Sequence, residues 1–100
     1  MLFHVSWQYP NPSEEGQRRS LQVLQKWQPP AGAQFQAFYE FADGSGGFAI
    51  VEVDSAATMA RTTAPWTPWL HFSVKPIVPQ EEAAHINIEA QAFLASVPQP

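Results

Sequence analysis

The sequence predicts an α+β protein with a ferredoxin-like βαββαβ order, a four-stranded antiparallel sheet and an extra C-terminal helix. Two observations support this fold class. Four segments alternate apolar and polar side chains with the period of a β-strand, and the segments after the first and third carry helix start signals. The chain of 100 residues fits one domain, residues 1–100. Because strand–helix–strand crossovers are right-handed, both helices are expected on one face of the sheet.

The first strand and the first helix are expected in the N-terminal third. Residues 2–9 alternate along their length, as a strand does. In the following helix, Asn11 is expected as the N-cap, Pro12 suits the first turn, and Glu14 completes a capping box. The helix is expected to end before Pro29, because proline cannot continue it. Its apolar positions are Leu21, Val23, Leu24 and Trp27.

A hairpin and a second helix are expected in the middle of the chain. Residues 35–41 and 48–53 alternate, and the turn "DGSGG" between them contains residues that tolerate positive φ. Asp54 or Ser55 can cap a short, alanine-rich helix that ends before Pro65. Small side chains let such a helix lie close to a sheet.

The last strand and the extra helix follow. Residues 70–78 form the fourth strand, and Pro76 and Pro79 indicate an edge position because proline donates no ladder hydrogen bond. A final helix is expected over residues 80–97. Its apolar stripe consists of Ile86, Ala90, Phe93 and Leu94.

Strict alternation divides the strand side chains between a helix-covered face and an open face. It places Trp7 of the first strand beneath the helices, and in the second strand it places Phe35, Ala37, Tyr39 and Phe41 there. The remaining side chains mix aromatic, aliphatic and titratable groups, which is typical of a small-molecule site or an interface. They are His4, Ser6, Gln8, Gln36, Phe38, Glu40, Phe48, Ile50, Glu52, His71, Ser73 and Lys75.

The candidate catalytic residues are His4, Glu52 and His71. They lie on strands expected to be neighbours, and a carboxylate beside an imidazole can orient it for proton transfer. The alternative is that these groups are solvated or form salt bridges across a dimer. The sequence contains no tight metal-ligand spacing such as HExxH, so we predict neither a metal nor a cofactor.

The candidate ligand-binding residues surround that group on the same face. Trp66 and Trp69 flank Pro68 just before the fourth strand, where their rings could form an aromatic wall. The alternative is that the two rings close the end of a barrel or pack against a partner. The complete set is Ser6, Gln36, Phe38, Ile50, Trp66, Trp69 and Ser73.

Composition restricts the partners. The formal charge of −4 disfavours nucleic acid and anionic membranes. The chain shows no signal peptide and no apolar run of the ~20 residues that cross a bilayer. The absence of cysteine favours a cytoplasmic location. Thirteen aromatic residues are difficult to bury in one small monomer, so a homodimer is expected.

The segment "GSGGFAIVEVDSAATMARTTAPWTPWLHFSVKPIV", together with the opening "MLFHVSWQY", resembles the small bacterial family catalogued as domain of unknown function 3303. The resemblance covers nearly the whole chain and implies the dimeric α/β-barrel superfamily. It implies no established activity and carries over no catalytic residue. The wider superfamily includes isomerases, monooxygenases and heme-degrading enzymes, but a shared fold does not transfer their reactions.

The sequence therefore predicts a homodimer whose open faces enclose a site for a small organic ligand. If the protein is an enzyme, an isomerase-like or cofactor-free monooxygenase-like proton transfer suits the residues best. The alternative is a non-catalytic dimerisation or protein-interaction module. In a third arrangement, the C-terminal helix of a neighbouring copy covers the sheet face.

Overall fold

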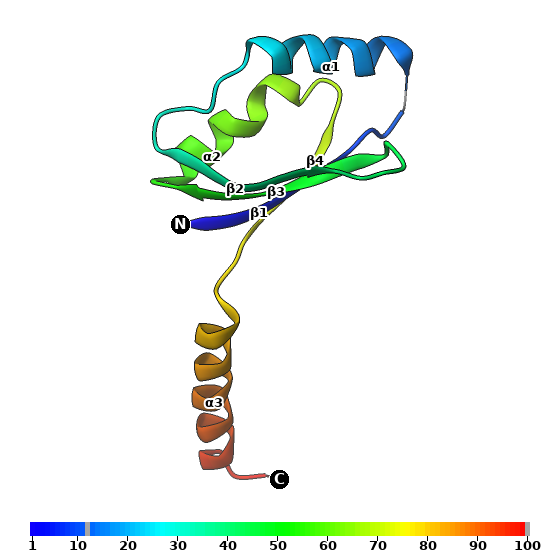
Figure 1. The fold of residues 1–100 in the computed structure, drawn as a ribbon. Helices are drawn as coiled ribbons and strands as arrows, with labels where there is room; N and C mark the ends of the chain where they lie inside the picture. The colour runs from blue at the N-terminus through cyan, green and yellow to red at the C-terminus, as the bar shows by residue number, and fades with distance from the viewer. Residues whose placement is uncertain (12, 100) are drawn as a thin grey trace.

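The structure is a computed structural model that describes residues 1–11 and 13–99. It confirms an α+β fold in which three α-helices accompany a four-stranded antiparallel sheet (Figure 1). A single 3₁₀ turn, η1, follows the second helix. The elements in chain order are β1 (Leu2–Gln8), α1 (Glu14–Lys26), β2 (Ala33–Glu40), β3 (Gly46–Val53), α2 (Ala56–Thr63), η1 (Ala64–Trp66), β4 (His71–Pro76) and α3 (Gln80–Ser96).

The strands lie side by side in the order β2-β3-β1-β4, which is consistent with a ferredoxin-like arrangement. Strands β1 and β3 occupy the centre, and in β3 every second side chain is buried. Strand β4 lies at an edge, as its prolines predicted. It ends at Pro76 and is therefore shorter than the predicted 70–78.

Helix α2 packs directly on the sheet. Its N-cap is Ser55, whose hydroxyl accepts a hydrogen bond from the backbone N–H of Thr58 at 3.2 Å. Met59 of α2 is buried against β1 and β3, and Val51 and Val53 are the largest fully buried side chains. The core therefore lies between α2 and the two central strands. Its buried members are Phe3, Val5, Ala49, Val51, Val53 and Met59.

Helix α1 covers the same face of the sheet as α2 but stands farther from it (Figure 1). It begins at Glu14 with Ser13 as the N-cap, because the Ser13 hydroxyl accepts from the backbone N–H of Gly16 at 3.0 Å. The predicted cap, Asn11, was wrong by two positions, and Pro12 lies outside the described residues. The only buried residue of α1 is Ser20.

A β-bulge in β2 changes which side chains face the helices. Phe35 lies opposite Val51 and Ala37 lies opposite Ile50, so Gln36 is an extra residue without a partner on β3. Beyond this point the alternation is reversed. Phe38 and Glu40 lie on the helix-covered face, opposite Ala49 and Gly47, and the predicted open-face positions of these two residues were wrong. Ala37 and Tyr39 lie on the open face instead.

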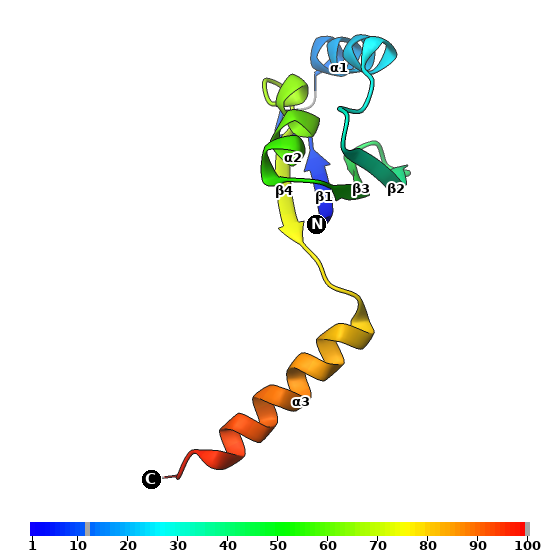
Figure 2. The same cartoon turned by 90° about the vertical axis from the view of Figure 1, so that its left-hand side faces the viewer.

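Helix α3 projects away from the sheet on the side opposite to α1 and α2 (Figures 1 and 2). The extended residues 77–79 connect it to β4. The helix spans 17 residues, none of which is buried. Its predicted apolar stripe is present, but that stripe has no surface to pack against within the described residues of this chain.

Candidate functional site

The predicted catalytic group does not come together. In the antiparallel register, Glu52 lies opposite Leu2, and His71 lies opposite Gln8 at the other end of β1. A strand rises about 3.3 Å per residue, so these two partners are separated by roughly 20 Å along β1. His4 lies between them. The three residues share the open face, but their register makes the expected convergence wrong.

Each of these three side chains has its own surroundings. The His4 ring stacks on Phe48, with ring centroids 5.6 Å apart and an interplanar angle of 13°. The Glu52 carboxylate accepts a hydrogen bond from the amino group of Met1 at 2.8 Å, and both partners are about half exposed. His71 is exposed at the start of β4. Across residues 1–11 and 13–99, no group of three or more His, Asp or Glu side chains could hold a metal ion.

The residues proposed to surround a ligand are also divided between the two faces. Ser6, Ile50 and Ser73 share the open face, where Ser6 pairs in register with Ser73. Gln36 is the exposed residue of the bulge. Phe38 lies on the helix-covered face.

The two tryptophans proposed as an open-face wall lie elsewhere. Trp66 is buried on the helix-covered face, where its indole N–H donates to the carbonyl of Ser20 in α1 at 3.2 Å. Trp69 is half-buried beside the first turn of α1, close to Gly16. The 3₁₀ turn η1 directs the chain up toward α1 before β4 begins, so Trp66 could not reach the open face.

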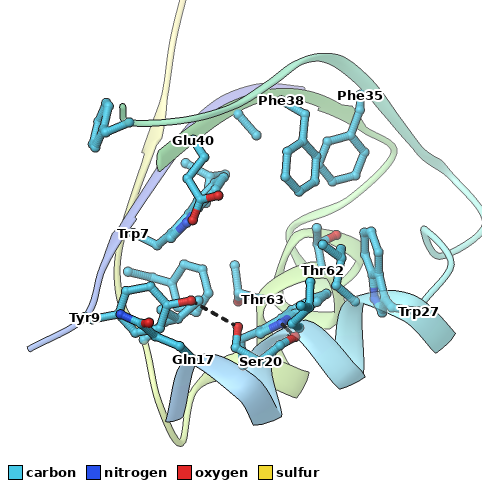
Figure 3. Close-up of a pocket in the computed structure, with 18 of the residues that line it drawn as sticks. Trp7, Tyr9, Gln17, Ser20, Trp27, Phe35, Phe38, Glu40, Thr62 and Thr63 are labelled. Atoms are coloured by element: carbon cyan, nitrogen blue, oxygen red, sulfur yellow. Dashed lines mark hydrogen bonds between the residues drawn. The ribbon is translucent and has the colours of Figure 1, made fainter. Parts of the chain in front are cut away.

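A cavity of about 490 Å³ lies between α1 and the sheet. It exists because α1 is held away from the strands. Leu21 and Leu24 line the cavity from above and remain 55% and 41% exposed, although apolar residues at their helical spacing normally pack on a sheet. Its lining residues come from α1, η1, the end of α2 and all four strands, with the loop after β2 (Figure 3).

Aromatic rings form a continuous chain along this cavity. Trp66 meets Trp27 edge to face at 5.0 Å, and Trp27 meets Phe35 at 5.8 Å. Phe35 stacks on Phe38 at 5.3 Å, and Phe38 meets Trp7 at 5.6 Å. The contact between Phe35 and Phe38 depends on the bulge, because the bulge places these two residues, which are three apart in the sequence, on the same face of the sheet. Stiff rings that brace one another in this way keep α1 from collapsing onto the sheet.

A few polar groups enter this apolar space. The Tyr9 hydroxyl lies 3.4 Å from the Ser20 hydroxyl and donates a hydrogen bond to it, and the carboxylate of Glu40 points into the cavity near Trp7 (Figure 3). Gln17, Thr62 and Thr63 complete the polar lining on the helix side. Among the described residues that line the cavity, Glu40 is the only carboxylate, so it is the group that could accept a proton from, or a hydrogen bond donated by, a bound molecule.

The sequence reasoning missed this site although a signal was present. Trp7 and Phe35 were already expected on the helix-covered face, and Trp27 was expected on the apolar side of the first helix. Three large rings on facing surfaces indicated that aromatic side chains would lie between the first helix and the sheet, but not how far apart they would hold the two. The contribution of Phe38 and Glu40 could not be predicted, because it depends on the bulge.

Fold and site together define an α+β protein with an apolar, aromatic-lined cavity that lies between one helix and an antiparallel sheet and is open to solvent. The chain belongs to the family described as Domain of unknown function (DUF3303), whose model matches residues 1–91. This match includes every strand, α1, α2 and the larger part of α3. No curated protein matches the chain. None of the helices in the described part of the chain has the length and hydropathy needed to span a membrane.

Proposed function

We propose that this protein binds a small, flat, largely apolar organic molecule in the cavity beneath α1. The observation that carries the proposal is the cavity itself. Its volume of about 490 Å³ lies within the range of roughly 300–1,000 Å³ that is typical of small-molecule sites. Its lining is mainly aromatic and aliphatic, with a few polar groups that could fix the orientation of a ligand.

The shape of the lining supports a flat ligand. The rings of Trp7, Phe38 and Phe35 form one side of the cavity, and aromatic surfaces favour planar partners that stack or meet them edge to face. The Glu40 carboxylate favours a ligand with a hydroxyl or amine hydrogen, because an ionised carboxylate only accepts hydrogen bonds.

In the catalytic form of this proposal, Glu40 moves a proton on the bound molecule, as an isomerase-like reaction requires. Tyr9 and Ser20 already share a hydrogen bond at the opposite side of the cavity and could hold a polar atom of the ligand. In the part of the chain that the structure describes, no histidine lines the cavity, so the imidazoles of His4 and His71 have no part in this proposed reaction.

We also propose a homodimer that forms through the open sheet face, in which two sheets face one another as in a dimeric α/β-barrel. The support for it is the aromatic row of Tyr39, Phe48 and His4 on that face, with ring contacts of 5.7 and 5.6 Å. The non-catalytic alternative, a dimerisation module, keeps this assembly without a ligand.

A neutral aromatic dye, Nile red, tests the cavity. Its fluorescence should rise when it is titrated with the full-length protein, because the dye leaves water for an apolar site. Leu24→Trp, which fills the cavity, should weaken binding by at least about tenfold, equivalent to 1.4 kcal/mol. Arg18→Trp adds the same ring to an exposed position of α1 outside the cavity and should leave the affinity unchanged. Equal affinities of the wild type and Leu24→Trp would refute binding in this cavity.

The natural ligand can then be sought in protein taken directly from cells. Native mass spectrometry should find a small molecule bound to the wild type at higher occupancy than to Leu24→Trp. If Glu40 contacts that molecule, Glu40→Gln should weaken its binding, since the amide cannot replace the charge-assisted hydrogen bond. Equal occupancy in Glu40→Gln would remove the proposed role of Glu40 and leave the cavity proposal intact.

A further inference from the structure

Helix α3 has two apolar faces. The 3.6-residue period places Ile86, Phe93 and Leu94 on a wide face and Ile88 on an opposite, narrower face that is otherwise alanine beyond Glu81 in the first turn. Ile88, Phe93 and Leu94 are 64%, 66% and 65% exposed. A helix that is apolar on opposite sides is typical of a helix buried between two surfaces, not of one that lies on a single surface. The full wide face is Ala83, Ile86, Ala90, Phe93 and Leu94, and the narrow face begins with Glu81 and continues with Ala84, Ile88, Ala92 and Ala95.

A second surface without a partner lies on the same side of the molecule. Helices α1 and α2 cover only one face of the sheet, and α3 departs on the side of the other face (Figure 1). That open face presents Leu2 and Ile50 together with the aromatic row of Tyr39, Phe48 and His4. Any second copy that approached this face would therefore meet α3 as well.

We propose that two copies of this chain associate through their open sheet faces and that the two α3 helices lie side by side between the sheets. The wide face of each α3 then packs on the sheet of the other copy, and its narrow, alanine-rich face lies against the sheet of its own copy. This inference rests on the proposed homodimer and adds to it the element that fills the interface.

The dimensions of the elements agree with this arrangement. The 17 residues of α3 extend about 26 Å at 1.5 Å per residue. Strands of 7 or 8 residues extend roughly 23–27 Å, so helix and strands have matching lengths. Two helices side by side measure about 20 Å across. Four strands spaced by about 4.8 Å measure about 19 Å, so two helices cover the whole width of the sheet.

The area that is buried when each α3 packs on the sheet of the other copy is sufficient for a stable dimer. If one side of each α3 meets the other copy, about 400 Å² of helix and a similar area of sheet are removed from water, on the basis of a helix diameter near 10 Å. The two α3 helices, each packed on the sheet of the other copy, then bury about 1,600 Å² in total, which is the usual size of a specific interface.

Charge and chain connection also agree. Helix α3 contains Glu81, Glu82 and Glu89 and neither lysine nor arginine, whereas the open face carries Lys75 together with Glu52, whose charge is already paired with the Met1 amino group. The backbone N–H of Ile77 donates to the carbonyl of Leu2 at 2.9 Å, so the chain remains attached to the sheet as far as Ile77. The reorientation that brings α3 between the sheets therefore falls on the two residues 78 and 79.

Sedimentation velocity of the full-length protein tests the proposal. The wild type should sediment as a dimer, with twice the mass of the 11.1 kDa chain. Ile88→Glu with Phe93→Glu places one charge on each apolar face of α3 and should halve the mass. His85→Glu with Ser96→Glu adds the same acidic groups to a polar strip of α3 and should leave the dimer intact. Both double variants should retain a cooperative thermal unfolding transition, because α3 contributes nothing to the core.

A substitution on the sheet distinguishes the proposed packing of α3 on the sheet of the other copy from a dimer in which the two α3 helices pair only with each other. Ile50→Glu should also halve the mass, whereas Gln25→Glu on the exposed surface of α1 should not. A dimer that survives Ile50→Glu but not the α3 substitutions would show that α3 pairs only with α3, which overturns the proposal. A dimer that survives Ile88→Glu with Phe93→Glu overturns the role of α3 but keeps the homodimer. A monomeric wild type overturns both, and leaves the ligand proposal in place.

Discussion

Replacing Trp66 by alanine tests whether this side chain supports α1. The ring is 9% exposed. A buried tryptophan covers about 150–250 Å², which corresponds to about 4–6 kcal/mol at 25 cal/mol per Å². The hydrogen bond from its indole N–H to the Ser20 carbonyl is lost as well. Because truncations of buried aromatic side chains usually cost about 3–5 kcal/mol, we expect Trp66→Ala to lower the free energy of unfolding by that amount.

Urea titration followed by far-ultraviolet circular dichroism measures this loss without relying on tryptophan fluorescence. Trp69→Ala is the matched control, since Trp69 is only half-buried and should cost about half as much. Trp66→Phe retains most of the ring and removes the donor, so about 1 kcal/mol is expected. The reasoning fails if Trp66→Ala costs no more than Trp69→Ala, because α1 would then be supported by other contacts.

Gly32→Ala and Gly44→Ala form a matched pair, since both glycines have positive φ, 90° and 75°. A Cβ on Gly32 meets the carboxylate of Asp54, whereas one on Gly44 meets nothing within 4 Å. Urea titration should therefore show a loss above the roughly 1–2 kcal/mol of positive φ only for Gly32→Ala. Glu52→Gln should change the free energy of unfolding by less than about 1 kcal/mol, because the ion pair between Glu52 and the terminal amino group is half exposed. A larger change in that free energy, measured by thermal unfolding, would contradict this expectation. The hydroxyl of Thr58 donates to Asp54 and lowers the pKa of that carboxyl below 3.8. The stability that this hydrogen bond contributes should be present above pH 3.8 and lost as the pH falls through the folded-state pKa. The difference in the free energy of unfolding between the wild type and Asp54→Asn should therefore shrink in acid. A difference that does not depend on pH would refute the role assigned to Asp54.

Much of the fold could be predicted because its signals are local. Alternating side chains located the strands to within a few residues, and the prolines near Lys75 correctly indicated an edge strand. The ends of elements were less certain. At the start of α1, Asn11 and Ser13 are both good capping residues, and only the backbone path determines which hydroxyl or amide reaches a free N–H.

In β2, the division of residues between the two faces could be predicted only as far as Phe35. No glycine or proline marks the bulge at Gln36, so strict alternation was the reasonable expectation. The extra residue is accommodated because it lets Phe38 join the rings beneath α1 while Tyr39 stacks on Phe48. This gain in packing involves three elements and cannot be read from one segment.

The candidate site was the least predictable part. The sequence argument sought titratable residues on neighbouring strands, and these residues do share a face, but it could not supply the register that separates Glu52 from His71. The cavity depends instead on the distance between α1 and the sheet. That distance follows from how Trp27, Trp66 and Phe35 fit together, and a periodic pattern contains no information about such a fit.

The single extra residue in β2 has a consequence for how this family could diversify. Deletion of Gln36 would remove the bulge and leave Phe38 and Glu40 on the cavity face, because their partners on β3 stay the same. Loss of the bulge in a strand of unchanged length has the opposite effect, since Gln36 would then pair with Ile50 and every later side chain would change face. Phe38 and Glu40 would leave the cavity together, and Tyr39 would enter it. Relatives of equal strand length that lack the bulge should therefore differ in ligand preference more than their overall sequence identity suggests.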